Sequence, residues 1–311
     1  MSVAFILGLR QATYDPSNLI RFHAAEAKVR DAYQEAAEAT GLDVEHLLHN
    51  TAEGEQAKRV VASVGLAAGM IGIHDVLVAR GIVPTAIGGM SMGAMVGTAL
   101  VNAVSRPDLY RLLAFADNAD GPDPDGPAQG CVGAILPIGL DYETLYGVRE
   151  GVWVAADFGM HESGAFRMLL LAGYKDALEE ATGHLPKELL VPSEEIIAPH
   201  CPLRKHVADQ VGEYLKKVDI ADPTVRMVSC LGRGILSTAS EIRDMLADNI
   251  TTGMSLDTVS QEMAFGGTRL AVVLGPTLPP VFEYPFSVAY VDAPEHVDAL
   301  PGLALAAGVK L

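Results

Sequence analysis

A Gly-x-Ser-x-Gly sequence at residues 89–93 constrains the fold of this chain more than any other feature. It follows a short apolar stretch, Thr85 to Gly88, that predicts a strand, and it precedes an apolar run to about Val104 that predicts a helix. A sharp strand-to-helix turn projects a serine hydroxyl clear of a sheet, and flanking glycines relieve the crowding there. The same letters also suit a turn that only packs a helix on a strand. The context favours a nucleophile at Ser91.

Strands and helices alternate along the 311 residues, which favours an α/β fold. Residues 3–8 predict a buried strand, and residues 20–40 and 54–80 predict helices. Residues 117–130 are rich in Asp, Pro and Gly and predict a loop. The pattern that follows, β-α-β-β-α-β, is that of a ferredoxin-like unit inserted into the larger α/β domain. Its predicted strands are 131–138, 152–158, 166–173 and 188–194, and its predicted helices are 141–149 and 175–183.

A serine hydroxyl is a weak nucleophile and needs a base. Of nine histidines, His200 lies between a predicted strand and a predicted helix at about 203–217. His296 is the competitor, because α/β-hydrolases place their histidine late, after an acidic residue. No strand–Asp–loop signature precedes His296, and a ferredoxin-like insert is not expected in that fold, so His200 is favoured. The N–H of Met92, at the start of the predicted helix, is the natural oxyanion donor.

Composition narrows the functional classes. The net charge is −17 and the isoelectric point is near 4.8, which argues against a general nucleic-acid binder. No run of eighteen apolar residues is present, so no membrane span is expected, and the N-terminus predicts a strand rather than a signal peptide. Three widely spaced cysteines indicate a reducing cytoplasm, with neither a disulfide framework nor a metal site.

Several segments together resemble the malonyl-CoA:acyl carrier protein transacylases and the acyltransferase domains of polyketide synthases. The segments that carry the resemblance are 62–93, which contains the Gly-x-Ser-x-Gly turn, 198–203 around His200, 241–246 and 273–276. The resemblance implies a hydrolase-like parallel-sheet core with an inserted ferredoxin-like subdomain and the active site between them. We assign residues 1–125 and 198–311 to the core and residues 126–197 to the subdomain.

The resemblance also implies a Ser–His dyad in which backbone or polar groups, rather than a carboxylate, orient His200. It implies no permanently bound cofactor. The substrates would be phosphopantetheine thioesters, either acyl-CoA or acyl carrier protein, and the partner would be an acyl carrier protein. The implied function is acyl transfer between thioesters by a ping-pong mechanism through an acyl-serine.

The chain departs from the family pattern around the site. Met90 stands where the family usually has His before its nucleophile, and Ser255 stands near the place of a late Gln. The first loop, Gly8-Leu9-Arg10-Gln11-Ala12, replaces a loop whose Gln donates to the oxyanion hole. We therefore expect Arg10 or Gln11 to supply that donor.

Another departure concerns the substrate. Family members that use malonyl or methylmalonyl groups hold the free carboxylate with an Arg, and this chain has Ala116 there with Asp117 beside it. Burying a carboxylate without a cationic partner costs several kcal/mol. We therefore expect an acyl group without a free carboxylate, in a substrate pocket formed by Met90, Ala116 and Ser255.

Acyl carrier proteins are usually acidic, so an enzyme with net charge −17 needs a locally basic docking face. Residues 204–243 are rich in Lys and Arg, and Arg204 and Lys205 are the expected docking residues. Two alternatives use the same motifs. One is an acyl hydrolase that strips acyl groups from carrier proteins, and the other is an inactive homologue that binds the carrier.

Overall fold

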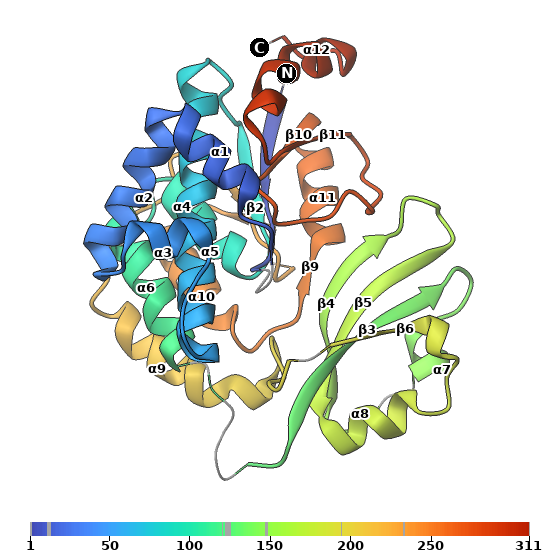
Figure 1. The fold of residues 1–311 in the computed structure, drawn as a ribbon. Helices are drawn as coiled ribbons and strands as arrows, with labels where there is room; N and C mark the ends of the chain where they lie inside the picture. The colour runs from blue at the N-terminus through green and yellow to red at the C-terminus, as the bar shows by residue number, and fades with distance from the viewer. Residues whose placement is uncertain are drawn as a thin grey trace.

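The computed structural model describes residues 2–10, 14–119, 121, 126–146, 149–193, 195–232 and 234–310. Figure 1 shows two sheets, the larger one covered by helices and the smaller one lying below and beside it. The termini meet at the end of the larger sheet that is remote from the smaller one. The junction between the two sheets therefore lies in the middle of the molecule.

Six strands form the larger sheet in the order β11-β10-β1-β2-β7-β8. All neighbours are parallel except β7 and β8. The central strand β1 is apolar and almost wholly buried, as expected for a strand covered on both faces. The strands are β1 (Ser2–Leu7), β2 (Ala86–Gly89), β7 (Arg226–Val228), β8 (Ile235–Leu236), β10 (Thr268–Leu274) and β11 (Ser287–Val291).

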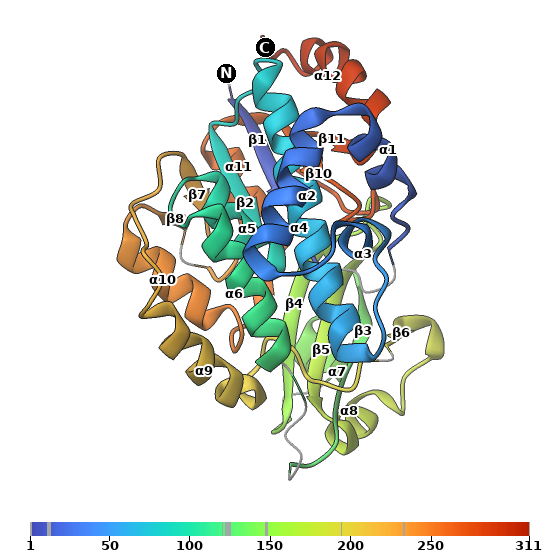
Figure 2. The same cartoon turned by 60° about the vertical axis from the view of Figure 1, so that its left-hand side comes forward.

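Helices cover both faces of this sheet. Successive residues of β2 face opposite ways: Ile87 lies toward helix α5, whereas Gly88 lies toward helix α11. The helices of this part are α1 (Ser17–Ala25), α2 (Ala27–Thr40), α3 (Val44–His49), α4 (Glu55–Ala79), α5 (Met92–Leu100), α6 (Arg106–Ala119), α9 (Lys205–Leu215), α10 (Ala239–Asp248), α11 (Leu256–Phe265) and α12 (Pro294–Ala306). Figure 2 shows α2, α4, α5 and α6 stacked together in front of the strands.

Helix α4 is the central helix of this layer. By length and composition it could cross a membrane, with a hydropathy of 1.8 over its most apolar stretch. However, 89% of that stretch is buried inside the protein. Helix α4 is therefore a core helix, and its apolar surface packs against α2, α5 and α6.

The smaller sheet has the order β6-β3-β5-β4-β9. The pairs β3–β5, β3–β6 and β4–β5 are antiparallel, and this arrangement fits the predicted βαββαβ unit. Its elements are β3 (Gln129–Pro137), α7 (Tyr142–Tyr146), β4 (Val152–Met160), β5 (Phe166–Tyr174), α8 (Lys175–Thr182) and β6 (Leu190–Pro192). The short strand β9 (Met254–Ser255) comes from much later in the chain and pairs with β4, so the two parts share backbone hydrogen bonds.

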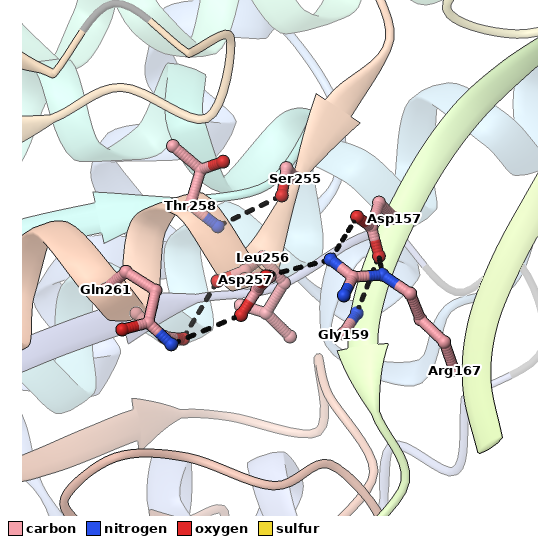
Figure 3. Close-up of polar contacts among 9 residues, drawn as sticks. Asp157, Gly159, Arg167, Ser255, Leu256, Asp257, Thr258 and Gln261 are labelled. Atoms are coloured by element: carbon pink, nitrogen blue, oxygen red, sulfur yellow. Dashed lines mark hydrogen bonds and ion pairs between the residues drawn. The ribbon is translucent and has the colours of Figure 1, made fainter. Parts of the chain in front are cut away.

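An ion-pair cluster reinforces this junction. The guanidinium of Arg167 on β5 binds both carboxylate oxygens of Asp157 on β4, at 2.7 and 2.5 Å. The same group reaches Asp257 in the first turn of α11, at 2.8 Å (Figure 3). Hydrogen bonds to these carboxylates raise the pKa of Arg167 above its usual range. The cluster ties the smaller sheet to a helix of the larger part.

The structure differs from the sequence predictions in its helices. The predicted helix 20–40 is two helices, because Glu26 has extended backbone angles of −118° and 121°. Helix α6 was not predicted, and the predicted loop 117–130 begins inside it. This matters for function, because α6 carries Ala116 and Asp117 to the site described below. Among the described residues of the predicted strand 188–194, the strand comprises Leu190–Pro192.

An ion pair joins α4 to α6. Arg106, at the start of α6, binds both carboxylate oxygens of Asp75 on α4, at 2.7 and 2.6 Å. Burial by itself raises the pKa of Asp75, but hydrogen bonds from His74 and Arg106 outweigh it and lower the pKa to about 2. The folded state therefore favours the ionised carboxylate.

We predict that Asp75→Asn lowers the free energy of unfolding at pH 7 by about 1 to 2 kcal/mol. Because the pKa of Asp75 is depressed on folding, this contribution is present above about pH 4 and is lost as the pH falls toward 2. Urea unfolding of both proteins at pH 7 and pH 3 should show the difference shrinking with acid. A difference that stays constant over this range would contradict the prediction. Asp31→Asn, at an exposed position of α2, is the control and should change little.

Candidate active site

Ser91 lies on the turn between β2 and α5 with φ 52° and ψ −120°, a conformation that residues with a side chain rarely adopt. The neighbouring glycines permit it. A Cβ on Gly89 would lie 2.5 Å from the carbonyl carbon of Gly93, and a Cβ on Gly93 would lie 2.4 Å from the carbonyl oxygen of Leu7. The Met90 N–H also donates to the Leu7 carbonyl at 2.9 Å. The turn is thus pressed against the end of β1, and the serine projects from it.

The structure brings Ser91 and His200 together. The distance between Ser91 Oγ and His200 Nε2 is 2.9 Å, and His200 Nδ1 lies 2.6 Å from the backbone carbonyl oxygen of Asn249. A carbonyl can only accept, so the imidazole Nδ1 carries the proton and Nε2 is left to accept from the serine hydroxyl. His200 also has a positive φ of 52°. This arrangement suits a general base beside a nucleophile.

Asn249 supports both residues of the pair. Its carbonyl orients His200, and its side-chain Nδ2 donates to the Ser91 carbonyl at 3.1 Å. The residue follows α10 and is only 3% exposed. The sequence prediction did not find Asn249, because a backbone carbonyl gives no signal in the choice of side chain. The sequence analysis had looked for a late polar residue near Ser255.

Backbone N–H groups of α5 and of the first loop are the candidate oxyanion donors. Met92 is the first residue of α5, where an N–H has no partner within the helix. In the first loop, the Gly8 and Leu9 N–H groups donate to the Thr277 side chain and carbonyl, each at 3.1 Å. Arg10 therefore remains the expected second donor of this loop. The other predicted donor, Gln11, lies outside the described residues.

A cavity of about 280 Å³ opens beside the pair. Its walls come from α4, α5 and α6 of the larger part and from β3 and β5 of the smaller sheet, so it lies between the helices of the larger part and the smaller sheet. The lining includes Leu9, Arg10, Ser63, Ser91, Met92, Met95, Leu113, Ala116, Asp117, Cys131, Leu170, Ile197, His200 and Met254. Burial raises the pKa of the Cys131 thiol, which favours its protonated and weakly nucleophilic form.

Ala116 lines this cavity, but the other two predicted pocket residues do not lie in its described lining. Met90 is wholly buried in the hydrophobic core under the turn, so the pocket prediction for Met90 was wrong. Ser255 is the N-cap of α11, where its Oγ accepts from the Thr258 N–H at 3.0 Å, and the pocket prediction for it was also wrong.

The two predicted docking residues, Arg204 and Lys205, differ in exposure. Arg204 is only 1% exposed, lines the cavity and donates to the Gly121 carbonyl at 3.0 Å, so its prediction as a surface docking residue was wrong. Lys205 is 76% exposed and pairs with Asp209 one turn along α9. His296, the competing base, lies at the start of α12 and pairs with Asp292 at 2.8 Å.

No protein-family model matches the chain, but two curated proteins are similar to it in sequence. A malonyl CoA-acyl carrier protein transacylase from Haemophilus influenzae is 24% identical over 264 residues, which are 80% of this chain and 80% of that protein. One component of a polyunsaturated fatty acid synthase from Thraustochytrium is 23% identical over 209 residues, or 66% of this chain. The chain spans only 7% of the length of that second relative.

Solved structures decide the fold. An acyl-carrier-protein S-malonyltransferase from Burkholderia pseudomallei superposes with a TM-score of 0.83 and 21% identity, covering 96% of this chain and 99% of that one. This chain has the fold of the malonyl-CoA:acyl carrier protein transacylases. A transacylase of the same fold, solved in complex with a type II polyketide synthase acyl carrier protein, has a TM-score of 0.82 at 18% identity and covers 96% of this chain and 98% of that one. The resemblance and the fold class predicted from the sequence are confirmed.

We predict that Gly93→Ala lowers the free energy of unfolding by about 3 kcal/mol or more, because its Cβ would overlap backbone atoms that cannot move aside. The matched control is Gly97→Ala, one turn along the same helix. There the nearest atom to the added Cβ is the Met227 methyl group at 3.4 Å, so this variant should be as stable as the wild type or slightly more stable. Urea unfolding measures both variants, and equal stability would contradict the role given to Gly93.

Proposed function

We propose that this chain is a serine acyltransferase that moves an acyl group between phosphopantetheine thioesters, from acyl-CoA or an acyl carrier protein to an acyl carrier protein. The observation that carries the proposal is the 2.9 Å contact between Ser91 Oγ and His200 Nε2 in the wall of the cavity between the two subdomains. The transacylase names of the relatives support it, as does the relative solved with its carrier protein.

The first half of the reaction forms an acyl-serine. His200 Nε2 takes the Ser91 hydroxyl proton while Oγ attacks the thioester carbonyl carbon. The Met92 N–H and a donor of the first loop, proposed to be Arg10, stabilise the resulting oxyanion. When the tetrahedral intermediate collapses, the carbon–sulfur bond breaks and the leaving thiolate takes the proton from His200.

The second half reverses these steps with a different thiol. The incoming pantetheine thiol gives its proton to His200 Nε2, and its sulfur attacks the acyl-serine carbonyl. Collapse of this second intermediate returns the proton to Ser91 Oγ and releases the new thioester. The Asn249 carbonyl holds the imidazole in one orientation through both halves, because it accepts from Nδ1–H whether or not Nε2 carries a proton.

The acyl group of the substrate has no free carboxylate. Ala116 leaves room in the cavity wall without offering charge, and the lining also includes the apolar side chains of Leu113, Met95 and Leu170. A short or branched neutral acyl group gains from burial against these side chains, whereas a carboxylate loses its hydration there.

We predict that Ser91→Ala abolishes the covalent acyl adduct that forms when the protein is incubated with neutral acyl-CoA, measured by intact mass. Ser63→Ala, which removes a second hydroxyl from the cavity wall, is the matched control and should still form the adduct. Survival of the adduct in Ser91→Ala would overturn the proposal. Adding an acyl carrier protein should then discharge the wild-type adduct onto its thiol. Discharge to water at the same rate with and without the carrier would instead favour the acyl-hydrolase alternative.

We also propose that Lys205 contacts the acidic carrier protein. Lys205→Glu should lower kcat/KM for an acyl carrier protein about three- to tenfold, because surface charges act mainly on the rate of encounter, and the loss should diminish at high salt. The value of kcat/KM for a small thioester such as acyl-CoA should stay unchanged in Lys205→Glu. Lys28→Glu, at an exposed position of α2, is the control for net charge. An equal loss with both substrates would count against docking at Lys205.

A further inference from the structure

The active-site cavity contains an ion pair whose acidic member, Asp117, has no part in the proposed acyl transfer. Arg10 Nη1 lies 2.5 Å from Asp117 Oδ1, and the two side chains are only 18% and 13% exposed. Arg10 follows the end of β1 and Asp117 lies in the last turn of α6, so distant parts of the chain supply the two charges. Both residues line the same cavity as Ser91.

The pair occupies one of the two guanidinium groups in the described lining of the cavity. The charged Arg, Asp and Glu side chains in the described lining are Arg10, Asp117, Glu195 and Arg204, which are two cations and two carboxylates. Arg204 is buried and donates to the Gly121 carbonyl. The guanidinium of Arg10 is compensated by Asp117 at hydrogen-bond distance.

A carboxylate on an incoming acyl group would therefore meet two obstacles. It would have to displace Asp117 from Arg10, which exchanges one charge-assisted hydrogen bond for another without gain. It would also lie close to the carboxylate of Asp117, and two like charges that share a site destabilise each other. A neutral acyl group meets neither obstacle.

We propose that Asp117 is a specificity-determining residue, which occupies the guanidinium of Arg10 and thereby excludes acyl groups with a free carboxylate. This inference rests on the proposed acyl-transfer function of the site. It adds that carboxylates are excluded because Asp117 occupies the guanidinium of Arg10, and not only because the side chain of Ala116 is small. Removing the charge at position 117 would expose a cationic group in the cavity that binds carboxylates.

The conservative variant is Asp117→Asn, because the amide keeps the size of the carboxylate and an oxygen that accepts from Arg10. The test is the binding of malonyl-CoA and acetyl-CoA, measured by calorimetry. It is made in a Ser91→Ala background, where neither thioester can form an acyl-serine. Asp117→Asn should raise the preference for malonyl-CoA over acetyl-CoA by about tenfold or more, as expected for a hydrogen bond to a charged group. Adding Arg10→Gln should return the preference to its starting value.

Several outcomes would overturn the inference. One is an unchanged preference in Asp117→Asn and in a second variant, Asp117→Ser. Another is a raised preference that survives Arg10→Gln, since the gain would then need no cation. Binding of neither ester by any variant would also contradict it. These results are separate from a failure of the proposed function, which would appear as wild-type protein that binds acetyl-CoA yet forms no acyl-serine.

Discussion

The hydrogen bond between Ser91 Oγ and His200 Nε2 is the interaction on which the functional account depends. It spans 2.9 Å between residues that are 109 positions apart in the chain. Both residues have positive φ angles, which cost free energy in residues other than glycine. Neighbouring contacts hold this geometry: Gly89 and Gly93 allow the turn to press on β1, and the Asn249 carbonyl fixes the imidazole. The strain is thus located where chemistry requires an exposed hydroxyl and a correctly oriented base.

The position of the smaller sheet determines what this pair can act on. Its strands β3 and β5 close one side of the cavity, and α6 closes another. The pairing of β9 with β4 and the contacts of Arg167 with Asp157 and Asp257 attach the smaller sheet to the core. The cavity that lies between these attached parts has room for an acyl group. Within the cavity, Arg10 and Asp117 neutralise each other. The charge of this part of the cavity wall therefore depends on two residues from separate parts of the chain.

Much of this could be predicted from the sequence, because strong local signals carried it. The apolar strand, the glycines around Ser91 and the flanking helix specify one turn, and the alternation after residue 130 indicated the smaller sheet. His200 was favoured as the base by its place between a predicted strand and a predicted helix, and its segment also resembles that of a known family. Each of these signals lies within a short stretch of chain. The resemblance then supplied the spatial relation between them, which periodicity does not contain.

The rest depends on long-range contacts that local patterns do not encode. The carbonyl of Asn249 orients His200, and any residue type has a carbonyl. Arg204 stands beside Lys205 in a basic segment, yet it is buried against Gly121 while Lys205 is exposed. The Asp-, Pro- and Gly-rich composition after residue 117 concealed the last turn of α6, and with it the pairing of Asp117 with Arg10.

The orientation of the His200 imidazole is the most direct test of this account. Two-dimensional ¹⁵N NMR of protein labelled at histidine, recorded where the ring is neutral, reports which ring nitrogen carries the proton. The account predicts a proton on Nδ1, donated to Asn249, and a change in the Nε2 signal when Ser91 is replaced by Ala. A proton on Nε2, or a His200 spectrum that is the same with and without the Ser91 hydroxyl, would contradict it.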